Sequence, residues 1–188
     1  MIPIHERQRE TRYAPIKVGR PTVETRTKDG KGSGDILKGK AAVFDEFAEI
    51  TNRFGDTFME KFSKDCMNET LADGHKVMAL FNHDWSCLMG STADNLTLVK
   101  KDDGLYFELT TKGFDLDRRI TELVRSGTID ACSIGFQVTE DVWRTVNGMK
   151  HRLIEKIELH EITLTPIPAY ERTSVEACGV PLDNPRVV

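Results

Sequence analysis

Short runs in which apolar and polar residues alternate make up much of the chain. They cover residues 21–27, 36–47, 96–100 and 105–109, and a nearly continuous apolar run covers 76–82. Alternation with a period of two is typical of a strand with one buried face, whereas a short apolar run is typical of a central strand. The sequence KDDG between the third and fourth runs indicates a hairpin.

The two longest strand-like runs lie near the C-terminus. They cover residues 129–143 and 149–167 and flank Asn147-Gly148. Asn-Gly is a preferred two-residue turn between antiparallel strands. The pattern therefore predicts a long hairpin.

Helical spacing appears in two segments. In residues 58–74, apolar side chains recur on one helix face, and Gly74 would end the helix. A second helix is predicted to begin at Asp115 as its N-cap and to end before Gly127. Its apolar stripe consists of Leu116, Ile120, Leu123 and Val124.

Many strands and few helices predict a mainly β protein with flanking helices (α+β), as an antiparallel barrel or sandwich. We expect residues 1–20 to form a flexible arm or a weakly held first strand and the glycine-rich residues 28–35 to form a loop. The folded domain should span residues 21–178, with a polar tail at 179–188.

Composition and charge narrow the class of protein. Among 188 residues, 39% are apolar and 30% charged, and the net charge of −4 gives no reason to expect nucleic acid as a partner. No apolar run approaches the roughly 20 residues that a membrane span needs. The first ten residues lack the apolar core of a secretory signal, so we expect a reducing cytoplasm. Four scattered cysteines without a CxxC pair are then expected as free thiols, namely Cys66, Cys87, Cys132 and Cys178.

A first candidate for chemistry is Ser133 in the run ACSIGF. In a strand, Ser133 would share one face with Ala131 and Gly135, while the opposite face is apolar. The two small neighbours leave space above the hydroxyl. On periodicity alone, an ordinary small strand residue is the commoner explanation.

His83 is a second candidate because it directly follows the apolar run 76–82. A side chain at the end of a central strand can leave the core and face a cleft. A structural histidine is the commoner explanation, and zinc binding with Cys87 is disfavoured because no second closely spaced ligand pair is present. We therefore expect neither a metal ion nor a cofactor.

The run IELHEITLTP holds two further candidates, His160 and Glu161. Adjacent residues in a regular strand point to opposite faces, so one of the two could reach a site, and a β-bulge would change which one. A buried Glu161 would need a partner, and a histidine would supply it.

Taken together and in order, these segments resemble the phage prohead proteases, also called head maturation proteases. The motifs are ALFNHD, the hairpin with DDGL, a helix ending in Arg-Ser-Gly, SIGF and EITLTPIPAY. The resemblance runs from about Gly39 to Val175. His83 and Ser133 are 50 residues apart, and Ser133 and Glu161 are 28 apart. The order and spacing of the motifs are more specific than any one of them.

The resemblance implies a fold similar to that of herpesvirus assemblins, an antiparallel β-barrel ringed by helices. It also implies a serine endopeptidase in which Ser133 is the nucleophile and His83 the general base. Glu161 lies in the segment that supplies the family's acidic third member. Viral relatives with this fold use a second histidine, which keeps His160 as the alternative.

By the same resemblance, the substrates are capsid and scaffold proteins and the protease itself, cleaved inside the assembling prohead in the host cytoplasm. Neither nucleic acid nor a membrane is implied as a partner, and assemblin-like relatives are compatible with a homodimer. The alternative function is a non-catalytic assembly protein that binds capsid or scaffold protein and keeps a vestigial site.

Overall fold

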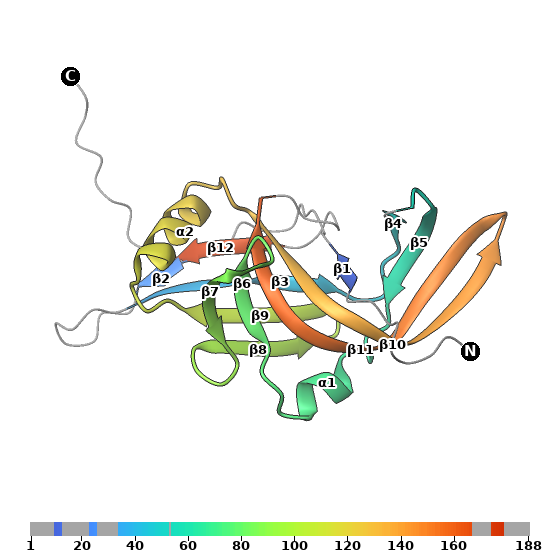
Figure 1. Ribbon diagram of the computed structural model, residues 1–188, viewed down its shortest axis with the longest axis horizontal. Helices are drawn as coiled ribbons and strands as arrows, with labels where there is room; N and C mark the ends of the chain where they lie inside the picture. Colours follow the sequence, from blue (N-terminus) through green and yellow to red (C-terminus); the bar gives the residue numbers. More distant parts are fainter. Residues whose placement is uncertain (1–9, 13–22, 26–33, 53, 167–173, 179–188) are drawn as a thin grey trace, which may run out of the picture.

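The computed structural model describes residues 10–12, 23–25, 34–52, 54–166 and 174–178. Within these residues, strands far outnumber helices, which confirms a mainly β protein (Figure 1). The elements are β1 (Glu10–Arg12), β2 (Val23–Thr25), β3 (Asp35–Val43), β4 (Ala48–Thr51), β5 (Thr57–Phe62), α1 (Asn68–Ala72), β6 (Met78–Phe81), β7 (Asp84–Ser91), β8 (Leu96–Lys101), β9 (Gly104–Thr110), α2 (Asp115–Arg125), β10 (Ala131–Val146), β11 (Met149–Thr165) and β12 (Ser174–Cys178).

The described strands form two sheets. A seven-stranded sheet has the order β1-β10-β11-β5-β4, and its β6 pairs with both β11 and β7. A five-stranded sheet has the order β12-β3-β9-β8, with β2 also paired to β3. Most pairings are antiparallel, but β11 pairs in parallel with β5 and β6. The closed barrel and the ring of helices stay predictions. The tail 179–188, most of the loop 28–35 and the rest of the arm 1–20 lie outside the described residues.

The long hairpin predicted at Asn147-Gly148 is present. β10 and β11 pair from Ala131↔Thr165 to Val146↔Met149, and Asn147 and Gly148 have φ angles of 49° and 80°. Positive φ at both central residues defines a type I′ turn, whose twist matches that of the strands it joins. Figure 1 shows the two strands curving together through the molecule.

The helix predicted over residues 58–74 is wrong in its first half. Residues 57–62 form β5, and only α1 is helical. The strand buries alternate residues, Phe58, Glu60 and Phe62, and the acidic one concealed this period of two in the sequence. Glu60 is fully buried, and its carboxylate is neutralised by Arg152, whose Nη1 donates to Glu60 Oε2 at 3.1 Å. Gly74 follows α1 with φ 78°, in the terminating position expected of it.

The second predicted helix is α2, with a different residue at its start. Asp115 is the first helical residue rather than the N-cap, which is Phe114. The buried Asp117 carboxylate instead accepts the backbone N–H groups of Phe114 at 3.2 Å and Lys112 at 2.8 Å. Gly127 has φ 75° and ends the helix as predicted.

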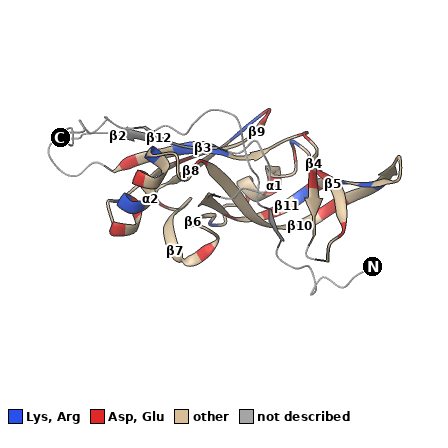
Figure 2. Ribbon diagram, turned by 90° about the horizontal axis from the view of Figure 1, so that it is seen from above, with Lys and Arg blue, Asp and Glu red and all other residues tan. Residues whose placement is uncertain are grey.

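The apolar core is one cluster shared by both sheets and α2. It includes Phe62, Phe136 and Ile154, whose side chains are almost fully buried. Charged residues of both signs are distributed along α2 and the strands (Figure 2). Among the described residues, no helix is long and apolar enough to cross a membrane.

The cysteines whose side chains are described, Cys66, Cys87 and Cys132, are free thiols, as predicted. Burial raises the pKa of the Cys66 thiol to about 12, and it also raises the pKa of Cys132. Both groups therefore stay protonated near neutral pH and act as small apolar residues of the core. Neither is a candidate nucleophile.

Replacing Arg152 with Met should lower the free energy of unfolding by about 3–5 kcal/mol, because it leaves the carboxylate of Glu60 buried without its cation. Urea denaturation followed by circular dichroism measures this change. The double variant Glu60→Leu/Arg152→Met should recover most of the loss. A double variant no more stable than the single one would contradict the role of the ion pair.

Candidate active site

Ser133, His83 and Glu161 lie together, joined by two hydrogen bonds. His83 Nδ1 is 2.5 Å from Glu161 Oε1, and His83 Nε2 is 3.0 Å from Ser133 Oγ. An ionised carboxylate can only accept, so Nδ1 carries the proton of the neutral ring and Nε2 accepts from the serine hydroxyl. This is the order of contacts that a Ser-His-acid site requires.

Ser133 lies on β10, opposite Thr163 of β11. Its neighbours along the strand, Cys132 and Ile134, are core residues, so its own side chain is on the other face. That face is covered too, and Ser133 is only 1% exposed. The hydroxyl is therefore hydrogen-bonded to a base but shielded from solvent.

Glu161 reaches the same face because β11 contains a bulge. The register runs from Gly135↔Glu161 to Phe136↔Leu159, which leaves His160 as an extra residue. Before the bulge, Leu159 packs in the core, and after it Ile162 does. The bulge thus exchanges the two faces of the strand and moves Glu161 from the core face to the face of Ser133.

His160, the alternative third member, has no such position. Its Nδ1 lies 3.8 Å from Glu158 Oε1, whereas Glu161 is the residue beside the His83 ring. Sequence periodicity left the choice between His160 and Glu161 open. The bulge decides which of them meets His83.

Gly135 makes room for the acidic side chain. A Cβ atom added at this position would lie 2.2 Å from Glu161 Oε1, well inside van der Waals contact. The space above this face, inferred from its small residues, is therefore filled partly by the protein's own carboxylate. Within the described part of the chain, the other oxygen, Oε2, is buried without a hydrogen-bond partner.

His83 is held in a tight turn between β6 and β7. Phe81 and Asp84 pair, and the two residues between them, Asn82 and His83, have φ angles of 54° and 57°. This is again a type I′ turn, in which the second position usually holds glycine. A histidine there costs conformational energy, and such strain is typical of functional positions.

Thr163 anchors this turn and was not among the residues predicted from the sequence. Its Oγ1 accepts the backbone N–H of His83 at 2.9 Å, and Thr163 is fully buried. A signal was available, because Thr163 is two residues after Glu161 and therefore on the same strand face. Its hydroxyl ties the base to the strand that carries the acid.

The segment around α1 fixes the bulge from the other edge of β11. Leu159 N–H donates to Thr70 Oγ1 at 2.9 Å, and His75 Nε2 is 2.6 Å from the Leu159 carbonyl. His75 Nδ1 also lies 2.5 Å from Asp73 Oδ1. Its hydrogen bond to the Leu159 carbonyl, aided by Asp73, raises the pKa of His75.

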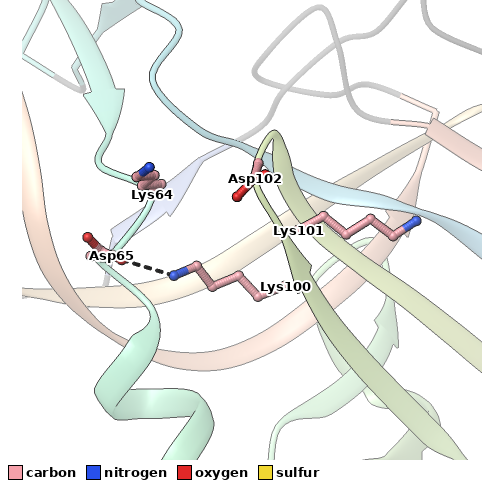
Figure 3. Close-up of a pocket in the computed structure, with 5 residues that line it drawn as sticks. All are labelled: Lys64, Asp65, Lys100, Lys101 and Asp102. Carbon is pink, nitrogen blue, oxygen red and sulfur yellow. Dashed lines mark hydrogen bonds and ion pairs between the residues drawn. The ribbon is translucent and has the colours of Figure 1, made fainter.

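Two surface pockets in the described part of the chain are lined by residues other than Ser133, His83 and Glu161. The larger, of about 530 Å³, is lined by Lys64, Asp65, Lys100, Lys101 and Asp102 (Figure 3). Lys100 Nζ donates to Asp65 Oδ1 at 3.1 Å across it. No His, Cys, Asp or Glu side chains gather in threes as metal ligands would, in the part of the chain that the structure describes.

The chain also resembles known proteins. Residues 21–184 match the family described as caudovirus prohead serine protease. A solved structure, that of the bacteriophage T4 capsid assembly protease gp21, superimposes with a TM-score of 0.54 at 13% sequence identity, over 84% of this chain and 95% of that one. The comparison with curated protein sequences gives no match.

The fold therefore resembles that of this phage capsid assembly protease. The chain belongs to the caudovirus prohead serine protease family.

Replacing His83 with Gly or with Ala removes the same imidazole, yet the two variants should differ in stability. Glycine adopts the left-handed turn conformation without strain, so we expect His83→Gly to be about 1 kcal/mol more stable than His83→Ala. Thermal unfolding of the two variants, measured side by side, tests this. Equal melting temperatures would contradict the strained turn.

The raised pKa of His75 makes part of the stability dependent on pH. This contribution is fully present below the unfolded-state pKa of about 6.5 and is lost as the pH rises through the higher folded-state pKa. His75→Ala should therefore lower the melting temperature more at pH 5.5 than at pH 9. The same decrease at both pH values would show that the charge of His75 has no role.

Proposed function

We propose that the protein is a serine endopeptidase that cleaves scaffold and capsid proteins, and itself, inside the assembling prohead in the host cytoplasm. The observation that carries this proposal is the chain of contacts from Ser133 Oγ through His83 to Glu161. Family membership supplies the reaction class and the setting.

In the proposed mechanism, Ser133 attacks the carbonyl carbon of the substrate peptide bond while His83 Nε2 takes its proton. A serine hydroxyl is a weak nucleophile at neutral pH, and a positioned base contributes roughly 10²–10⁴ in rate. His83 then transfers this proton to the leaving amine, and water hydrolyses the acyl-enzyme in a second round. Glu161 holds the ring in the required tautomer and stabilises the imidazolium.

The alternative of a vestigial site explains less. His83 lies in a conformation that costs energy for a non-glycine residue, and Glu161 is buried at 2% exposure. A protein that only bound capsid or scaffold would gain nothing from either feature. Both are expected where a base and the acid that orients it must meet a nucleophile.

Ser133→Ala should abolish cleavage, with a loss on the order of 10⁶-fold, and Glu161→Gln a smaller one on the order of 10⁴-fold, because the Ser-His pair remains. The assay is cleavage of the phage's capsid and scaffold proteins co-expressed with each variant. Circular dichroism should show Ser133→Ala folded, since only a hydroxyl is lost. Full cleavage by folded Ser133→Ala would reject the proposal.

A serine-reactive phosphonate provides a second measurement. Mass spectrometry should locate its adduct on Ser133 in the parent protein and find none in His83→Ala, in which the base is missing. If another serine were labelled as fast as Ser133, the assignment of Ser133 as the nucleophile would be contradicted.

A further inference from the structure

The strand that carries Ser133 is covered on its outer edge by the chain's own N-terminal segment. β11 occupies one edge of β10, and β1 occupies the other (Figure 1). The antiparallel register is Glu10↔Phe136, Thr11↔Gly135 and Arg12↔Ile134. Among the described residues, the last of these pairs, Arg12↔Ile134, is one residue from Ser133.

The direction of β1 relates it to the nucleophile. As β1 runs from residue 10 to residue 12, it passes β10 from Phe136 toward Ile134, so its C-terminal end leads toward Ser133. A peptide that added to this edge in the same way would be paired through residues on the N-terminal side of the bond presented to Ser133. Main-chain pairing of this kind binds extended peptides with little demand on their sequence.

The burial of Ser133 is a second, independent observation. The residue is 1% exposed, and its hydroxyl is hydrogen-bonded to His83. Nucleophilic attack requires a carbonyl carbon to come within about 3–3.5 Å of the hydroxyl oxygen. A protein substrate therefore needs a rearrangement around Ser133, and β1 has to leave the edge of β10 before a peptide can pair there.

We propose that the outer edge of β10, at Ile134–Phe136, is a binding site for an extended peptide that adds as an antiparallel strand. Residues 10–12 of the chain occupy this site as an intramolecular competitor. The identity of the incoming peptide as the substrate rests on the proposed function; the competition between β1 and a peptide does not. Release of β1 frees this edge of β10 for the incoming peptide.

The binding test uses the full-length chain with Ser133→Ala, so that cleavage has no effect. Thr11→Pro disrupts β1, because proline lacks the backbone N–H and disfavours strand pairing. The control Thr11→Val keeps the N–H and remains compatible with strand pairing. The probe is a fluorescent peptide with the sequence of residues 5–16, HERQRETRYAPI, followed by fluorescence anisotropy. The same peptide with proline in place of its threonine is the peptide control.

We expect the Thr11→Pro chain to bind the peptide on the order of tenfold more tightly than the Thr11→Val chain, because the tethered segment no longer competes. Hydrogen exchange of residues 131–138 should be faster in Thr11→Pro and slow again when the peptide is added. Thr11→Gly, which only weakens the strand, should fall between the two and replaces Thr11→Pro if that variant misfolds. Equal affinity and equal exchange in all variants would overturn the proposal, as would a peptide that binds none of them.

A parallel measurement separates this proposal from the catalytic one. In chains that retain Ser133, Thr11→Pro should speed phosphonate labelling of Ser133 by a factor similar to the gain in peptide affinity. Tighter peptide binding without labelling of Ser133 would support the peptide-binding edge of β10 and contradict the assignment of Ser133 as the nucleophile. Equally rapid labelling of Thr11→Pro and Thr11→Val, with unchanged peptide affinity, would support Ser133 as the nucleophile and contradict the competition by β1.

Discussion

The bulge at His160 is the constraint on which the candidate site depends. In a regular strand, the apolar residues before and after this point could not all face the core, and Glu161 would lie on the core side. One extra residue satisfies the core on both sides of the bulge and brings a carboxylate to the face of Ser133. The hydrogen bonds from Thr70 and His75 to Leu159 hold the strand at this point. These hydrogen bonds help to fix the register of β11, and the positions of Glu161 and Thr163 relative to Ser133 follow from that register.

Several energetic costs coincide where the proposed reaction takes place. His83 occupies a turn position that favours glycine, and the carboxylate of Glu161 is buried. Gly135 lies so close to this carboxylate that any side chain in its place would collide with it. Other parts of the structure obey ordinary rules, with apolar strands in the core and glycine at the end of α2, although the buried pair of Glu60 and Arg152 is an exception. The stability of the two sheets and their common core offsets these local costs.

Much of this could be predicted from the sequence, because local patterns encode it. The Asn147-Gly148 turn and the stripe of α2 are determined by neighbouring residues. The strand β5 was missed because Glu60 interrupts its apolar alternation, and the residue that neutralises it, Arg152, is 92 residues away. The choice between His160 and Glu161 was undetermined for the same reason. A bulge depends on the pairing partner, which one strand's periodicity does not contain.

The position of the site along the β10–β11 hairpin has a consequence for how such proteins can diverge. The pairs Ser133↔Thr163 and Gly135↔Glu161 lie near the open end, whereas Asn147-Gly148 closes the other end many residue pairs away. Residues added to or removed from both strands at the tip, as matched pairs, leave the register at the open end unchanged. The tip can therefore vary in length and sequence from one phage to another while the reacting groups keep their spacing.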